Sequence, residues 1–200
     1  MASIIAVGSM AFDSIETPFG KEEKVIGGSV NHFSLSASYF APVRCISVVG
    51  EDFPESHLSM LSKRSIDTTG IRKEKGNTFH WAGKYGYDLN EAKTLATHLN
   101  VFENFSAEVP QTYKDSEFVF LGNILPSLQD SVLSQVKNPK FVALDTMNFW
   151  IESQKEALLK VISKANAVII NEAELRQLTQ QQNISMAARQ MRAWGPQILV

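Results

Sequence analysis

Apolar and polar positions follow two rhythms along this chain, one typical of buried strands and one typical of helices that are apolar on one face. Short apolar runs predict buried strands over residues 3–8, 43–49, 117–121, 141–144, 167–170 and 197–200. The stretches between them predict helices over residues 29–40, 54–64, 126–136, 151–163, 172–178 and 185–193. Strands separated by helices imply a mostly parallel sheet with right-handed crossovers. The expected fold class is therefore α/β.

The stretch from residue 71 to about 105 breaks this rhythm. Large aromatic side chains alternate there with small or polar ones, which predicts a strand with one apolar face; they are Phe79, Trp81, Tyr85 and Tyr87. Residues 94–102 are the expected antiparallel partner across a turn at 88–90, and residues 13–17 alternate like a half-exposed strand. We expect a β insertion here instead of another strand–helix unit.

The composition excludes several classes of protein. With 44% apolar and 20% charged residues the chain can bury a core, and its formal net charge of −2 argues against binding to nucleic acid or to an anionic membrane. No apolar run is long enough to span a bilayer, and no apolar signal segment follows a charged start. The single cysteine, Cys45, lies in an apolar run and is expected to be a buried, unreactive thiol. We therefore expect a cytoplasmic protein.

Two strand ends carry acidic and amide side chains. Asn171 and Glu174 follow the strand expected over residues 167–170, and Asp145 and Asn148 follow the strand before it. In open α/β sheets ligands bind outside the carboxyl ends of the strands. Two interpretations of the Asn171 motif stay open. The residues cap a helix, which the sequence alone favours, or they organise a hydrated Mg²⁺ ion and nucleotide phosphates.

The first helix is preceded by Gly27 and Gly28, with Ser29 as its expected N-cap. Paired glycines allow a ligand to approach the backbone, although a plain turn is the more common reason for them. The segment is neither a Walker loop nor a dinucleotide-binding pattern. Asn31, in the first turn, suits recognition of a hydroxyl group. The Asp13 carboxylate either accepts two hydrogen bonds from a diol or is a solvated loop residue.

Taken in order, these segments resemble the N-terminal two-thirds of the ribokinase-like (PfkB) family of carbohydrate and nucleoside kinases. The matching segments are Val7-Gly8 with Asp13, Gly27-Gly28-Ser29-Val30-Asn31, Val49-Gly50-Glu51-Asp52, residues 65–70, Asp145-Thr146-Met147-Asn148 and Asn171-x-x-Glu174. The chain departs from the family around Pro54-Glu55, where a glycine is usual. The resemblance implies a Rossmann-type, mostly parallel sheet flanked by helices. Residues 1–200 would form an incomplete domain, with a β lid over about 13–26 and 71–105.

The same resemblance implies ATP-dependent, Mg²⁺-assisted phosphoryl transfer to a hydroxymethyl group of a sugar or nucleoside. It assigns substrate binding to Asp13, Gly27, Gly28, Asn31, Asn123 and Asp145, and metal and phosphate binding to Asn171 and Glu174. The lid would exclude water, and in many members it contributes to a homodimer. For the aromatic face of the lid we expect packing within the lid or a dimer in preference to direct stacking on a sugar or base.

The resemblance also implies a missing part. The family's general base is an aspartate in a C-terminal G-A-G-D motif, which residues 1–200 do not contain. The base and the adenine pocket would lie beyond Val200, so we expect a truncated, partial or split chain that is inactive alone. The alternatives are a non-catalytic module that binds a sugar or nucleoside, and a structural α/β domain without a pocket.

Overall fold

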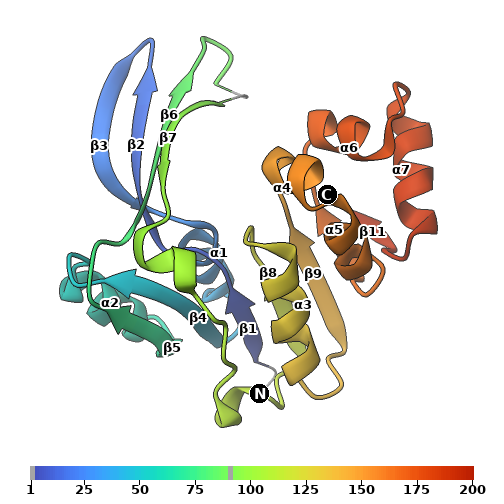
Figure 1. Cartoon of the computed structure of the whole chain (residues 1–200). Coiled ribbons are helices and arrows are strands. Elements are labelled where there is room, and N and C mark those ends of the chain that lie inside the picture. Colours follow the sequence, from blue (N-terminus) through green and yellow to red (C-terminus); the bar gives the residue numbers. More distant parts are fainter. Residues whose placement is uncertain (1–2, 90–91) are drawn as a thin grey trace.

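The computed structural model describes residues 3–89 and 92–200 and contains one large and one small sheet (Figure 1). The large sheet has seven strands, all paired in parallel. In spatial order they are β11 (Ile198–Leu199), β10 (Ala167–Ile169), β9 (Phe141–Asp145), β8 (Phe118–Leu121), β1 (Ile4–Val7), β4 (Val43–Gly50) and β5 (Ile66–Glu74). The expected mostly parallel α/β fold is confirmed.

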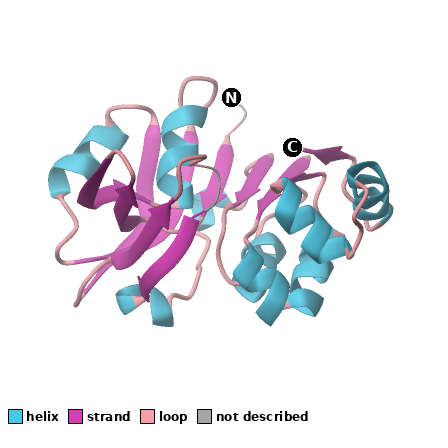
Figure 2. Cartoon of the chain, turned by 90° about the horizontal axis from the view of Figure 1, so that it is seen from above, coloured by secondary structure: helices cyan, strands magenta, loops and turns pink. Residues whose placement is uncertain are grey.

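Helices lie on both faces of this sheet (Figure 2). Side chains of α1 (Ser29–Ala37) and α2 (Glu55–Ser62) share one apolar core with β1, β4 and the start of β5. The other face carries a second core beneath the helices that follow β8. These are α3 (Pro126–Gln135), α4 (Asn148–Ser153), α5 (Lys155–Ile162), α6 (Glu172–Thr179) and α7 (Ile184–Ala193). Two short 3₁₀ helices, Asn100–Asn104 and Gln111–Tyr113, precede β8 in the chain.

Two helix predictions differ from the structure. The helix expected over residues 151–163 is two helices, because Gln154 has non-helical backbone angles of φ −138° and ψ 32° between them. The N-cap of α1 is Gly28 and not Ser29. Ser29 is the first helical residue, and its backbone N–H and hydroxyl exchange hydrogen bonds with Ser9.

The small sheet is mixed and rises above the large one at the upper left of Figure 1. Its order is β3 (Gly20–Gly27), β2 (Ala11–Thr17), β6 (Phe79–Tyr85) and β7 (Ala92–His98). The hairpin of β6 and β7 is antiparallel as expected, whereas β2 and β6 are parallel. Of the expected turn at 88–90, residue 90 lies outside the described residues. Residues 71–74 belong to β5 of the large sheet, so the β insertion begins later than predicted.

The predicted aromatic face exists, but its members differ in environment. Phe79, Trp81 and Tyr85 are half-buried, whereas Tyr87 follows the end of β6 and is 82% exposed. The Trp81 indole lies along the backbone of Gly83, where a Cβ atom would be 2.0 Å from the ring. Gly83 therefore leaves room for the ring on this face of the small sheet.

The environment of Cys45 gives a direct test of the core. The thiol is fully buried in β4 and contacts the Ser34 hydroxyl at 2.9 Å, and burial raises its pKa to about 12. Because the thiolate is the reactive form, native Cys45 is expected not to react with a thiol reagent at pH 8. Full labelling in guanidinium chloride is the control, and rapid labelling of the native protein would contradict the packing.

Candidate active site at the carboxyl ends of the strands

Two carboxylates meet where β9 and β10 end. Asp145 is the last residue of β9 and is paired with Ile169 of β10, and Glu174 lies in the first turn of the helix that follows β10. Burial raises the pKa of both carboxyls, that of Asp145 to about 6. The charge of Glu174 raises the Asp145 pKa further, while hydrogen bonds from the backbone N–H groups of Thr146 and Asn123 lower it. These groups accordingly lie close together.

Glu174 also belongs to a complete capping box. The Asn171 Oδ1 accepts from the Glu174 N–H at 2.9 Å, and the Glu174 carboxylate accepts from the Asn171 N–H at 3.2 Å. The capping interpretation is therefore confirmed. The nearby Asn148 N–H, at the start of α4, lowers the Glu174 pKa that burial raises.

The donor set at this edge fits a hydrated magnesium ion better than a fully protein-coordinated metal. The described residues hold no group of three or more His, Cys, Asp or Glu side chains suited to a metal. Asp145 and Glu174 supply two neighbouring carboxylates. Mg²⁺ commonly keeps several waters and takes only one or two carboxylates, so two are sufficient. Their raised pKa values match a pair that a cation would stabilise in the charged form.

Asn123 follows β8 and is held by residues that the sequence did not single out. Its Oδ1 accepts a hydrogen bond from Trp150 Nε1 at 2.9 Å, while its N–H donates to Asp145. Gln129 of α3 is buried beside it and donates to the Gly122 and Asp145 carbonyls. Gln129 had a signal in the sequence, because it is a polar residue on the apolar stripe that continues through Val132. Trp150 had none.

Asp13 lies on the small sheet and packs directly against the glycine pair. A Cβ atom at Gly27 would be only 1.9 Å from Asp13 Oδ2, so the carboxylate occupies the space that a side chain would need. Gly28 has φ +96°, and a Cβ there would be 2.3 Å from the Ser9 carbonyl oxygen. Burial raises the pKa of Asp13, and the nearby imidazoles of His32 and His80 lower it. Asp13 is therefore not the solvated loop residue that the sequence left open.

The Asn31 side chain does not lie where its expected role in substrate binding requires. Its side chain is 2% exposed, and its Oδ1 contacts His57 Nε2 at 2.7 Å, so the amide faces α2 instead of the carboxyl edge. The exposed side chain in that turn is His32, whose charge affects Asp13. Helical periodicity separates neighbouring residues by about 100°, so a change of one position selects another face.

The two halves of the site adjoin through small residues. The Ser29 hydroxyl lies so close to Gly8 and Gly122 that Cβ atoms there would be 2.5 Å and 2.8 Å from it. Gly8 follows β1 and Gly122 follows β8, which are neighbours in the sheet. The start of α1 therefore packs beside the strand end that carries Asn123. Asp13, Gly27 and Gly28 form one side of the edge, and Asn123, Asp145 and Glu174 form the other.

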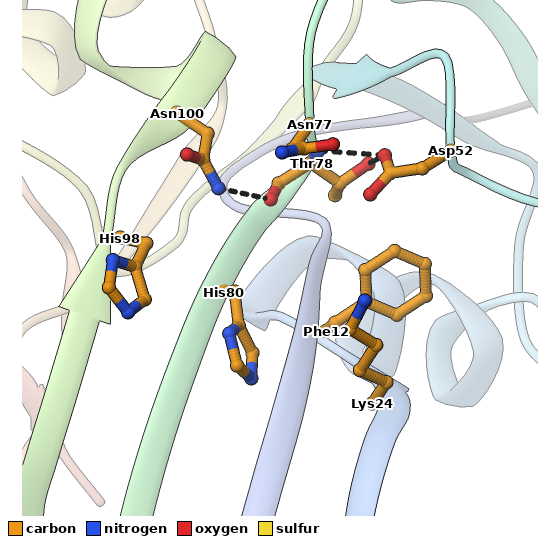
Figure 3. A pocket seen from close by; sticks show the side chains of 8 residues that line it. All are labelled: Phe12, Lys24, Asp52, Asn77, Thr78, His80, His98 and Asn100. Atoms are coloured by element: carbon orange, nitrogen blue, oxygen red, sulfur yellow. Dashed lines mark hydrogen bonds between the residues drawn. The ribbon is translucent and has the colours of Figure 1, made fainter.

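A separate polar pocket of about 240 Å³ lies on the face of the small sheet that is opposite to Asp13 (Figure 3). Successive strand residues point to opposite faces, so Phe12 points into this pocket while Asp13 points away from it. The pocket also contains His80, His98 and Lys24, and the Asp52 carboxylate accepts two hydrogen bonds from Thr78 at its rim. None of the predicted substrate or metal residues lines it.

Comparison with known proteins agrees with this geometry. The family model described as pfkB family carbohydrate kinase matches residues 1–200. A cytidine kinase of Thermococcus kodakarensis (strain ATCC BAA-918 / JCM 12380 / KOD1) is 25% identical over 205 residues, which cover 100% of this chain and 72% of the relative. In the described part of the chain, no helix has the length and apolar character needed to cross a membrane.

Solved structures show the same fold at low sequence identity. A nucleoside kinase of Methanocaldococcus jannaschii superposes with a TM-score of 0.71 at 18% identity, covering 94% of this chain and 68% of that one. A ribokinase of Cryptococcus neoformans var. grubii serotype A, in complex with ADP, gives 0.68 at 15% identity, covering 97% and 67%. In both cases about a third of the other chain has no counterpart in residues 1–200.

Proposed function

Because this chain belongs to the pfkB family of carbohydrate kinases, we propose that its complete protein transfers the terminal phosphoryl group of ATP to a hydroxymethyl group of a sugar or nucleoside. The observation that carries the proposal is the juxtaposition, at one sheet edge, of the Asp145 and Glu174 pair with Asp13 and its two glycines. The substrate oxygen attacks the γ-phosphorus, the bond to ADP breaks, and a general base takes the hydroxyl proton. Residues 1–200 contain no G-A-G-D segment, so that base is assigned outside them.

Each group of residues has a distinct role in this proposal. Asp13 accepts hydrogen bonds from substrate hydroxyls, and Gly27 and Gly28 let the substrate approach the backbone. Asn123 and Asp145 complete the substrate side, and Glu174 and Asn171 orient a hydrated Mg²⁺ ion. The Asp145 carboxylate lies beside Glu174, so it also contributes charge to the Mg²⁺ position. Bound Mg²⁺ neutralises charge on the transferring phosphates. Asn31 is left with a supporting role, since its amide holds His57.

The small sheet supports a nucleoside as the substrate. Asp13 of β2 is paired in register with Trp81 of β6, so both side chains lie on the same face. A carboxylate for a ribose diol then stands beside an indole that can stack on a base, and such stacking contributes about 1–3 kcal/mol. The relatives named cytidine kinase and nucleoside kinase point the same way. This differs from the sequence-based expectation, which favoured lid or dimer packing for the aromatic face.

The test is a panel of nucleosides and sugars with labelled ATP and Mg²⁺, applied to the gene product that contains residues 1–200. A phosphorylated nucleoside is the expected result. If no member of the panel is phosphorylated, the kinase proposal fails. If sugars alone are phosphorylated, the kinase proposal stands and the nucleoside assignment fails.

Replacing Asp13 with asparagine is expected to weaken substrate binding by ~10- to 100-fold, because hydrogen bonds to a charged group contribute about 1.5–3 kcal/mol. Calorimetric titration with the preferred substrate measures this effect without requiring turnover. Glu22→Gln, on the exposed neighbouring strand β3, is the matched control and should bind normally. Unchanged affinity of Asp13→Asn would remove Asp13 from the site.

A second candidate function is a binding module without catalysis, which would use the same face of the small sheet that carries Asp13 and Trp81. For this candidate, the 200-residue chain should bind a nucleoside in calorimetry but neither ATP nor ADP.

The cytoplasmic location and a homodimer through the small sheet stay predictions. Phe19 and Tyr87, 74% and 82% exposed and in edge contact at the end of this sheet, are the apolar surface that a dimer would cover.

A further inference from the structure

Gln129 is a polar side chain in an apolar environment. It lies on the inner face of α3, is 1% exposed, and shares its stripe with the fully buried Val132. An amide transferred from water to such a place costs free energy unless its hydrogen bonds are replaced. A leucine or methionine would fill the same space without that cost, so the hydrogen bonds of the amide need an explanation.

The Gln129 amide joins two neighbouring strands at their ends. Its Nε2 donates to the Gly122 carbonyl at 2.9 Å and to the Asp145 carbonyl at 3.0 Å, with the Leu121 carbonyl further away at 3.4 Å. The backbone pairing of β8 and β9 ends at Leu121 and Leu144. The side chain therefore continues the connection between the strands one residue beyond the last backbone pair.

That connection lies directly behind the candidate site. Asn123 directly follows Gly122, and Asp145 carries the other carbonyl that Gln129 holds. The relative position of the Asn123 and Asp145 side chains depends on how far apart the two strand ends lie. Gln129 holds a carbonyl on each of them and so sets that separation. The Asn123 side chain is held from the other side by Trp150.

We propose that Gln129 is a positioning residue, whose amide fixes the ends of β8 and β9 and thereby places Asp145 and Asn123 toward the substrate. The inference rests on the proposed kinase function for its catalytic consequence, but its structural part does not. Gln129 is buried and has no role in binding substrate or phosphate in this proposal. It acts only through the two carbonyls that it holds.

Gln135 on the same helix supplies a matched control. Its Nε2 donates to the Ala107 carbonyl at 3.0 Å and the Ser131 carbonyl at 3.1 Å, and its Oε1 accepts from the Val109 N–H at 3.0 Å. It is therefore a second amide on α3 that holds backbone groups, but these groups belong to the segment before β8 and to α3 itself, not to the ends of β8 and β9. Loss of Gln135 lowers stability without altering the candidate site.

The experiment compares Gln129→Met and Gln135→Met in the 200-residue chain, with the NOEs between the backbone N–H groups of residues 122–123 and 145–146 measured by NMR. Gln129→Met should weaken these NOEs between the ends of β8 and β9, because the side chain no longer holds a carbonyl on each strand. Gln135→Met should leave them unchanged. Unchanged NOEs in a folded Gln129→Met protein overturn the proposal.

A second variant covers the case in which Gln129→Met does not fold. Gln129→Asn keeps a polar side chain but is one methylene shorter and cannot reach both carbonyls, so it should weaken the same NOEs between the strand ends. Wild-type NOEs in a folded Gln129→Asn protein also overturn the proposal.

In the complete gene product, Gln129→Met should lower kcat by ~10- to 100-fold, as expected for a misplaced reacting group, while Gln135→Met stays within about twofold of wild type. Equal losses in the two variants overturn the catalytic part. An inactive wild type contradicts the proposed function but leaves the NMR comparison as a valid test of positioning.

Discussion

Asp145→Asn is expected to make the protein more stable at pH 8, by up to about 3 kcal/mol. The carboxyl group is held at the buried end of β9, where burial raises its pKa to about 6 from an ordinary value of 3.8. Each pKa unit corresponds to about 1.4 kcal/mol, so keeping this group charged in the folded state costs about 3 kcal/mol. Asparagine is neutral and still accepts from the Thr146 and Asn123 N–H groups, so it removes most of that cost.

The pH dependence has a definite sign. Well below pH 4 the carboxyl is protonated in both the folded and unfolded chain, and the variant should match the wild type. Between pH 4 and 6 the folded state binds more protons than the unfolded state, so wild-type stability from this group falls as pH rises. The advantage of Asp145→Asn should therefore grow through that window and stay constant above it.

Urea unfolding at pH 4, 6 and 8 measures this difference, provided that the slopes with denaturant are the same. Asp115→Asn is the control, because this carboxylate is exposed and paired with Lys137 at 3.3 Å, a kind of pair that contributes only about 0–1 kcal/mol. A variant that is less stable than wild type at pH 8 would contradict the burial argument. Added Mg²⁺ should stabilise wild type and have a smaller effect on Asp145→Asn, since binding only to the folded state raises stability.

Gly28→Ala is expected to lower the free energy of unfolding by about 4 kcal/mol. Gly28 has φ +96°, and a side chain in such a conformation costs about 1–3 kcal/mol. A Cβ there would also lie 2.3 Å from the Ser9 oxygen and 2.8 Å from the Met10 Cα, and such overpacking adds about 1–3 kcal/mol. These neighbours are backbone atoms, so no flexible side chain can move aside.

The same substitution should disturb the candidate site. The Ser9 carbonyl accepts from the Val30 N–H, and Ser9 exchanges hydrogen bonds with Ser29, so displacement of Ser9 loosens the start of α1. Gly20→Ala is the control, because its Cβ would have no neighbour within 4 Å. Thermal unfolding of the two variants gives the comparison. Equal stability of Gly28→Ala and wild type would show that the turn relaxes without cost.

Much of the fold could be predicted because strands and helices have local patterns. Each buried strand of the large sheet was visible as an apolar run, except for the start of β5, which the sequence assigned to no strand. That segment begins with Ile66 but contains Asp67 and Thr68, as expected for the outer strand of a sheet. The region of the exposed strand β3 was placed in the β lid by the family resemblance alone, because residues 20–24 carry no buried side chain that would mark a strand in the pattern.

The candidate site was predicted less completely, because the sequence does not show which way a helical side chain points. Asn171, Glu174, Asp145 and Asn123 follow strands, so the parallel sheet brings them to one edge whatever their side chains do. Asn31 and His32 lie on a helix, where one step along the chain changes the face. Packing against His57 settled which of them points inward.

The chain order of apolar runs, glycines and acidic strand ends was thus sufficient for the fold class and for the edge at which ligands bind, because these depend on residues close together in sequence. That order could not predict the parallel pairing of β2 with β6, the Gln129 connection between β8 and β9, or the raised pKa of Asp145. Each of these depends on groups brought together from distant or separate elements. Burial and electrostatic coupling exist only once those elements pack.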